Sequence, residues 1–140
     1  MDCPFCAIVE GRLLASLIAE TELAVAFVGY RQVVPGHVLV VPRAHVENVY
    51  ALDAETAAAV MTLAVRVARA VRAAFDPPGL NLWQSNGDAG GQEVAHFHLH
   101  VQPRRYDDGL LRIYPAEVPP PEDRAALDHL AQLIRPHIDG

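Results

Sequence analysis

The sequence of 140 residues is short of positive charge and cysteine, and it has no long apolar run. Its 11 basic residues are outnumbered by 17 acidic ones, which gives a formal net charge of −6. Nucleic-acid partners usually require a basic surface, so we expect no nucleic acid as partner. An anionic ligand must then be captured by local donors, because the protein as a whole offers no positive field.

No apolar run approaches the roughly 20 residues that a membrane-spanning helix needs, although 51% of the residues are hydrophobic. We therefore expect no membrane partner. The first residues carry neither a basic segment nor an apolar core of a secretory signal, so we expect a cytoplasmic location. In that compartment the two cysteines favour a metal site or free thiols over a structural disulfide.

The segment from Gly90 to Arg104 carries the clearest chemical signal. Three histidines alternate there with three apolar residues, in the order His96, Phe97, His98, Leu99, His100 and Val101. An alternation with period two is typical of a β-strand with one buried face. We therefore expect the three imidazoles on one face, close enough to serve a single small ligand. A helix would spread the same residues around its axis.

These residue types predict chemistry at phosphorus. A neutral imidazole is a competent nucleophile near pH 7, and His98 has an imidazole neighbour on each side. The preceding Gly87, Gly90 and Gly91 allow backbone N–H groups to approach a phosphate, and the Gln92 amide could donate to a leaving oxygen. The pattern predicts that His98 attacks phosphorus, that a covalent histidine intermediate forms, and that water then cleaves it.

The remaining periodicity predicts further strands and helices. Apolar runs predict strands over 23–28, 37–41 and 80–84, connected in a way that favours an antiparallel sheet. Asp53 is a good N-cap for a helix that ends at 76–79, where the sequence reads Asp-Pro-Pro-Gly. Its apolar stripe includes Val60 and Phe75, and its arginines are expected to face solvent. A second helix is expected over 122–137.

The run from His96 to Gln102 resembles the signature of the histidine triad (HIT) family, His-φ-His-φ-His-φ-φ, where φ is apolar. A second block, from Val33 to His45, is similar to the upstream strand of that family. This resemblance implies an α+β, HIT-like fold with an antiparallel sheet, one long helix packed on it and a C-terminal helix. It also implies a homodimer. We expect a single domain over 1–140, with a core over about 3–104 and a C-terminal extension over 105–140.

The resemblance also implies a function. Family members cleave nucleoside phosphoramidates or dinucleoside polyphosphates as nucleotidyl hydrolases or transferases, so a purine nucleotide or dinucleoside polyphosphate is the expected partner. By position, His98 is the nucleophile, His100 and His37 support it, and Gln92 lies beside the leaving group; His98, His100 and Gln92 also contact substrate. Other positions that match substrate-binding residues of the family are Phe5, Ile8, Phe27, Tyr30 and Ser85.

The motif Cys3-Pro4-Phe5-Cys6 supplies half of a tetrahedral zinc site. Two cysteines cannot complete the coordination shell, and the family resemblance implies Cys3, Cys6, His45 and His96 as the full ligand set. Zn²⁺ held by four protein ligands would be structural, because no coordination position stays open. The alternatives are two unligated thiols or a thioredoxin-like dithiol, although that motif normally opens a helix after a strand.

Two positions depart from the family pattern. Gly29 stands where the family usually has Asp or Asn to bind the ribose hydroxyls, and Gln102 stands where an apolar residue is expected. The missing ribose ligand supports an alternative function, a nucleotide-binding module with little or no turnover. A third reading makes the three histidines ligands of a catalytic zinc. Next-nearest imidazoles on one strand are widely spaced for a metal, which makes that reading the weakest.

Overall fold

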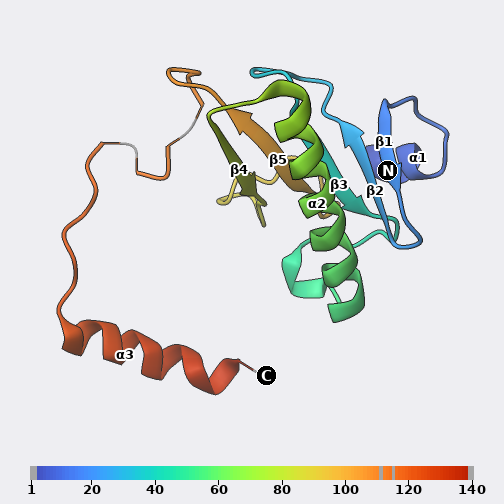
Figure 1. Cartoon of the computed structure of the whole chain (residues 1–140). Helices are drawn as coiled ribbons and strands as arrows, with labels where there is room; N and C mark the ends of the chain where they lie inside the picture. Colours follow the sequence, from blue (N-terminus) through green and yellow to red (C-terminus); the bar gives the residue numbers. More distant parts are fainter. Residues whose placement is uncertain (1–2, 111, 115, 139–140) are drawn as a thin grey trace. The chain divides into compact units, whose positions relative to one another are not determined.

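A computed structural model describes residues 3–110, 112–114 and 116–138 of the protein. Its sheet has five strands in the order β1-β2-β3-β5-β4, and every neighbouring pair is antiparallel. The strands are β1 (Leu17–Glu20), β2 (Ala24–Val28), β3 (Val38–Pro42), β4 (Gly79–Trp83) and β5 (Leu99–Arg104). The helices are α1 (Pro4–Val9), α2 (Ala54–Phe75) and α3 (Arg124–Ile134), with short 3₁₀ turns η1 (Val49–Ala51) and η2 (Arg135–His137) (Figure 1). The expected α+β class is confirmed.

Helix α2 covers one face of the sheet (Figure 1). It begins as expected, because the Asp53 carboxylate accepts a hydrogen bond from the backbone N–H of Thr56 at 2.7 Å. Its buried side chains form one hydrophobic cluster with side chains of the sheet and of the segment before β5. The helix contributes Val60, Leu63, Ala64, Val67 and Val71, and the other members are Ala24, Ala26, Val38, Val40, Phe97 and Val101. Phe75 is the last residue of the helix and is 44% exposed.

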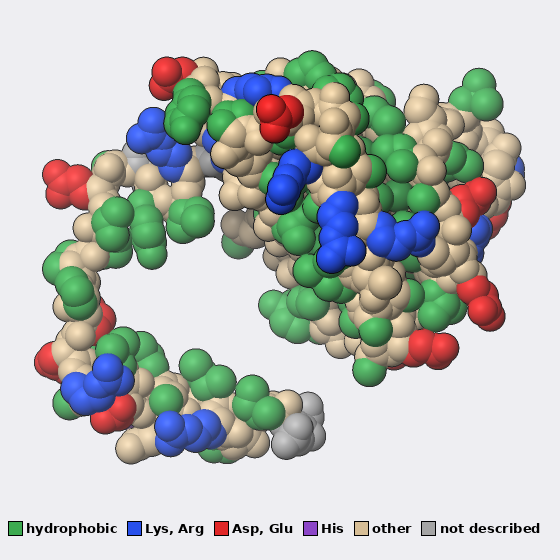
Figure 2. Space-filling model, viewed as in Figure 1, with side chains coloured by type: hydrophobic (Ala, Val, Ile, Leu, Met, Phe, Trp, Pro, Cys, Tyr) green, Lys and Arg blue, Asp and Glu red, His purple; other side chains and the backbone are tan. Residues whose placement is uncertain are grey.

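The arginines of α2 face outward, as the sequence predicts. Arg66, Arg69 and Arg72 are exposed, and Figure 2 shows basic side chains on the face of the molecule that carries this helix. The helix is therefore amphipathic: most of its apolar stripe is buried against the sheet, and its arginines face outward.

The other face of the sheet is also buried. Alternate residues of β2 and β3 pack there against Phe5 of α1, in a second cluster of Phe5, Val25, Phe27, Leu39 and Val41. Both faces of β2 and β3 are thus covered, which explains why these strands read as almost continuous apolar runs. Because His100 is the cross-strand partner of Leu39, the histidine face lies on the same side as α1.

The histidine segment differs from the predicted strand in one respect. Strand β5 begins only at Leu99, and His96 lies in a bend before it. The N–H of Phe97 donates to the carbonyl of Val46 at 2.6 Å, outside the ladder between β3 and β5. His96 and His98 therefore precede the regular strand, but the alternation continues through them. Both rings contact Phe5 on the side of α1, whereas Phe97, Leu99 and Val101 lie in the cluster with α2, so the histidines share one side of the sheet as expected.

The described chain divides into two compact units, one up to Gly109 and one from Leu110. In the second unit, Asp123 caps α3 through the N–H of Ala126 at 2.8 Å, and the helix leaves Leu127, Leu130 and Ile134 exposed. A single domain over the whole chain stays a prediction. Among the residues described, no helix combines the length and hydropathy that a membrane crossing requires.

Leu63 tests the packing of α2 on the sheet. It is 1% exposed, so we expect Leu63→Ala to lower the free energy of unfolding by about 2–5 kcal/mol, from lost burial and a residual cavity. Met61 lies on the same helix and is 46% exposed, so Met61→Ala should cost less than about 1 kcal/mol. Urea unfolding of both variants provides the measurement, and equal losses would contradict the packing described.

Candidate functional site

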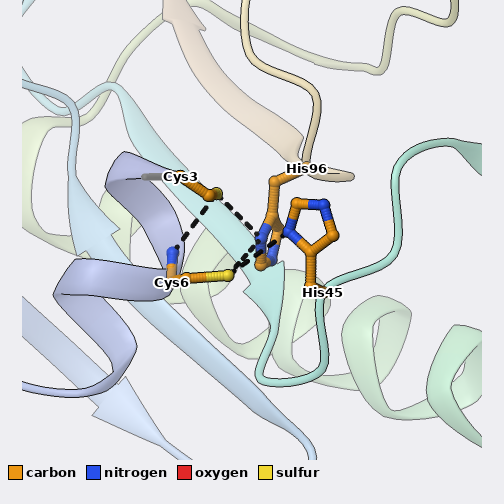
Figure 3. Close-up of side chains that lie close together, drawn as sticks. All are labelled: Cys3, Cys6, His45 and His96. Carbon is orange, nitrogen blue, oxygen red and sulfur yellow. Dashed lines mark hydrogen bonds between the residues drawn. The ribbon is translucent and has the colours of Figure 1, made fainter. Parts of the chain in front are cut away.

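Two cysteines and two histidines converge at the start of the chain (Figure 3). Cys3 is the N-cap of α1, and its Sγ accepts a hydrogen bond from the N–H of Cys6 at 3.4 Å, so the first turn of this helix brings both thiols to one point. His45 follows β3, and His96 comes from the bend before β5. One ligand atom from each of these four residues lies within 4.8 Å of every other.

The distances suit a tetrahedral ion. Cys3 Sγ lies 3.3 Å from His96 Nδ1, and Cys6 Sγ lies 3.3 Å from His45 Nδ1 and 3.5 Å from His96 Nδ1. A zinc ion with ordinary Zn–S and Zn–N bonds separates such ligand atoms by roughly 3.5 Å. The four residues named from the sequence therefore fit a metal in both chemical type and spacing.

The tautomer of His96 also fits a ligand. Its Nε2 lies 2.9 Å from the carbonyl of Pro42, which can only accept, so Nε2 carries the proton. In a neutral ring the lone pair then lies on Nδ1, the atom that faces the thiols. The ring is fully buried, and burial lowers its pKa, which favours this neutral form. A backbone carbonyl that orients a metal-binding histidine is a common second layer of such sites.

The Cys6 thiol does not have the character of a reactive redox cysteine. Burial, with help from a hydrogen bond to Cys3, raises the pKa of the Cys6 thiol. Reactive dithiols require the opposite shift, because the thiolate is the nucleophile. A metal that displaces the protons accounts for the cluster better than dithiol chemistry does.

His98 is oriented by the backbone of His96. Its Nδ1 lies 2.8 Å from the carbonyl oxygen of His96, so Nδ1 carries the proton and the lone pair of the neutral ring lies on Nε2. The edge of Phe5 packs against the ring, with centroids 5.1 Å apart. His98 is 7% exposed, and burial lowers its pKa. The arrangement leaves a neutral imidazole whose free lone pair, on Nε2, has the character that a nucleophile needs.

His37 and His100 form a second pair beside it. His37 Nε2 and His100 Nδ1 are 2.8 Å apart, and their rings lie within 19° of one plane. The centroid of His100 lies 4.9 Å from that of His98. Burial lowers the pKa of both rings, and for His100 it falls to about 3, with further contributions from His98 and His37. The two facing nitrogens can therefore share one proton between neutral rings at pH 7.

His37 is held by the turn before β3. The Gln32 amide donates to the carbonyls of Gly29 at 2.6 Å and His37 at 2.8 Å, and it accepts from the N–H groups of Gly36 and His37. All of the groups on this amide are thus used to close the turn. These hydrogen bonds of Gln32 fix the turn that places His37 beside His100, as expected from the sequence.

Gln92 binds backbone in the present structure. Its amide donates to the carbonyls of Glu47 at 2.6 Å and Val94 at 3.0 Å, and accepts from the N–H of Gly87 at 2.9 Å. Both of its N–H groups are therefore engaged in shaping the loop. Asn86 acts similarly, because its side-chain oxygen accepts from the N–H of Val49 at 2.8 Å. The place of Gln92 beside a leaving group stays a prediction.

The other residues expected to bind substrate differ in their surroundings. Phe5 and Phe27 are buried with ring centroids 5.5 Å apart, and Ile8 packs against their cluster. Tyr30 is instead 87% exposed, with the guanidinium of Arg31 5.1 Å from its ring centroid. Ser85 follows β4, and its carbonyl accepts a hydrogen bond from Gln84. The structure thus groups Phe5, Ile8 and Phe27 but not Tyr30.

Trp83 belongs to the site but was missed in the sequence. Its indole stacks on His100 with centroids 4.2 Å apart and planes 12° apart, and it lies 5.6 Å from His37. In the sequence, its only link to the site is its place on the expected strand before the histidine segment. Its pairing with His100 depends on the register between β4 and β5, which the sequence does not reveal.

The sequence and the fold are similar to those of known proteins. The HIT domain model matches residues 11–107. The Bacillus subtilis protein named "Protein hit" is 41% identical over 74% of this chain and 71% of its own. Adenosine 5′-monophosphoramidase hnt1 of Schizosaccharomyces pombe is 34% identical over 91% of this chain and 93% of its own. A zinc-bound histidine triad family protein from Mycobacterium smegmatis superposes with a TM-score of 0.73, at 35% identity, over 95% of this chain and 98% of its own.

The lowered pKa of His100 predicts how stability depends on pH. Between its ordinary value of 6.5 and about 3, the unfolded chain binds a proton that the folded chain does not. The contribution of His100 to the free energy of unfolding is therefore complete above pH 6.5 and is lost as the pH falls to about 3. The substitution His100→Phe removes this titration while keeping an aromatic ring.

Over pH 5–6 we expect the slope of unfolding free energy against pH to be smaller in His100→Phe by roughly 1 kcal/mol per pH unit. Chemical unfolding at several pH values measures it. Between pH 7 and 8 the two slopes should agree, since His100 is neutral in both states there. Identical slopes at pH 5–6 would show that His100 is not shielded from protonation.

Proposed function

The chain belongs to the histidine triad (HIT) family, and from this premise we propose that it is a nucleotide-binding hydrolase or nucleotidyl transferase that works through His98. Its substrates in this proposal are nucleoside phosphoramidates or dinucleoside polyphosphates. The phosphoramidase name of the fission-yeast relative supports the first class. The same likeness predicts a cytoplasmic homodimer, and light scattering after gel filtration would test the dimer.

The orientation of His98 carries this proposal. Its Nδ1–H is bound by the His96 carbonyl at 2.8 Å, so Nε2 keeps a lone pair at neutral pH without help from a base. A second neutral pair, His37 and His100, lies alongside. A nucleophile held in one tautomer beside proton-sharing groups is the arrangement that covalent catalysis requires.

The reaction follows in two balanced steps. His98 Nε2 forms a bond to phosphorus while the P–N or P–O bond to the leaving group breaks. An amine leaving group takes its proton from the His37–His100 pair, and a phosphate leaving group departs as the anion. Water then attacks the same phosphorus, the N–P bond breaks, and a nucleoside monophosphate leaves with the neutral imidazole restored. In this scheme His100, with His37 behind it, contacts the substrate and assists the proton transfers.

A covalent adduct is the direct test. Intact-protein mass spectrometry after mixing with adenosine phosphoramidate, and separately with a diadenosine polyphosphate, should show the mass of one adenylyl group. The quench must avoid acid, because a histidine–phosphorus bond is acid-labile. His98→Ala should show neither adduct nor turnover, with a loss of at least about 10³-fold because the nucleophile is absent.

The control is Met61→Ala, because Met61 is half exposed on α2, which covers the sheet face opposite the histidines. Its adduct should form as in the wild type. If the wild type forms no adduct and turns over neither substrate, nucleotidyl transfer from these nucleotides is refuted. An adduct that persists in His98→Ala would assign the nucleophile elsewhere.

We further propose that the cluster of Cys3, Cys6, His45 and His96 holds structural zinc. Its geometry and the zinc-bound relative from Mycobacterium smegmatis support this. Zinc would tie α1 to the segment that carries His98; with four protein ligands it has no position for substrate. The reading in which three histidines hold a catalytic zinc loses its basis, because His96 faces the cysteines.

Metal analysis should find about one zinc per chain, as expected for a closed four-ligand site. The substitution Cys6→Ser should remove most of the zinc and lower the melting temperature by at least about 10 °C, because metal binding contributes folding free energy. His98→Ala should keep its zinc. Full metal content in Cys6→Ser, or none in the wild type, would refute the site.

The alternative of a binding module rests on Gly29. Gly29 lies beside His37: a Cβ atom added to Gly29 would be 3.4 Å from His37 Nδ1. Glycine has no side chain that could bind a ribose there. If a nucleotide binds and no adduct or turnover is seen, that alternative is favoured. Equilibrium dialysis with adenosine monophosphate beside the adduct experiment separates the two functions.

A further inference from the structure

Trp83 lies on the edge strand β4, directly across from His100 on β5. Cross-strand partners share a face of the sheet, so the indole stands on the histidine face. It is 37% exposed, and it is the single tryptophan of the sequence. The reaction proposed above gives this residue no role.

The shape of the indole matches the histidine pair. His37 and His100 are joined edge to edge by the 2.8 Å contact between Nε2 and Nδ1, and their planes differ by only 19°. The plane of Trp83 lies within 12° of His100 and 28° of His37, with centroids 4.2 and 5.6 Å away. A two-ring indole can lie over two joined imidazoles, whereas a single ring of phenylalanine can cover one.

We propose that Trp83 is a positioning residue that keeps the His37–His100 pair in its hydrogen-bonded plane. The χ2 torsion of histidine is soft, so without a partner on its face the His100 ring can rotate and carry Nδ1 away from His37. The stacked indole opposes that rotation. His100 Nε2 is thereby directed away from His37 and left for the substrate. The inference rests on the function proposed above.

The environment of the pair supports this role. The titratable groups that face His100 are His37 and His98, and burial lowers the pKa of His37. An indole over the pair limits the access of water to one face. A pair that is open to water can take a second proton, and two facing N–H groups then repel instead of sharing a hydrogen bond.

The test compares three variants by steady-state kinetics with adenosine phosphoramidate. Trp83→Leu should lower kcat about tenfold or more, because the pair loses its fixed geometry. Its KM should stay within about threefold, since substrate contacts are retained. Trp83→Phe, which stacks on His100 alone, should fall between Trp83→Leu and the wild type. Leu82→Ala is the matched control, because Leu82 is 38% exposed on the same strand and points to the opposite face.

NMR of the histidine ring protons gives a readout that is independent of activity. In the wild type, the ring current of the indole should shift the His100 signals upfield; Trp83→Leu should abolish the shift and Leu82→Ala should keep it. An unshifted His100 in the wild type overturns the inference without any variant. So does Trp83→Leu with wild-type kcat, or a kcat in Leu82→Ala that falls equally.

The kinetic and NMR results also separate the two proposals. A wild type that turns over no phosphoramidate or polyphosphate refutes the proposed function. The effect of Trp83→Leu on the His100 signals then still decides whether the indole holds the pair. A wild type that is active, combined with Trp83→Leu that is equally active, refutes only the role of Trp83.

Discussion

His96 is bound in three directions, and the arrangement of both sites depends on it. Its Nδ1 faces the thiols of Cys3 and Cys6, its Nε2–H donates to the Pro42 carbonyl, and its own carbonyl accepts from His98. A displacement of the His96 backbone would therefore change the tautomer and direction of His98. The proposed metal site and the proposed nucleophile are thus linked through one residue. His96 lies in a bend before β5, where its ring faces the cysteines and its carbonyl accepts a hydrogen bond from His98.

The amide side chains near the site form hydrogen bonds to backbone groups. Gln32 closes the turn that presents His37, and Gln92 and Asn86 tie the loop before the histidine segment to residues 47–49. Loops that approach a ligand have few apolar contacts to hold them, so amide side chains stabilise them through hydrogen bonds to the backbone. The rigid sheet positions His100, whereas these amide contacts position the groups around it.

Much of this arrangement could be predicted from the sequence, and the misses have a common cause. The strict alternation around His98, the Asp53 cap and the apolar runs led to the right elements, and the family resemblance named the four residues that the structure brings together at Cys3. Trp83 and the contacts of Gln92 were out of reach, because they depend on strand register and on the path of a loop. His96 lies before the regular strand, where the N–H of Phe97 binds the carbonyl of Val46, and local periodicity does not reveal such a tertiary contact.

The protonation of the cluster bears on the choice between catalysis and binding. A module that only captures an anionic nucleotide would gain from positively charged imidazoles, especially in a chain with a net charge of −6. Burial here lowers the pKa of His37, His98 and His100, so all three lean toward the neutral form. Neutral rings bind an anion less well but keep the lone pairs that attack phosphorus and accept protons. The three imidazoles therefore offer an anionic nucleotide little positive charge at the point where it would bind. This favours an enzyme over a binding module.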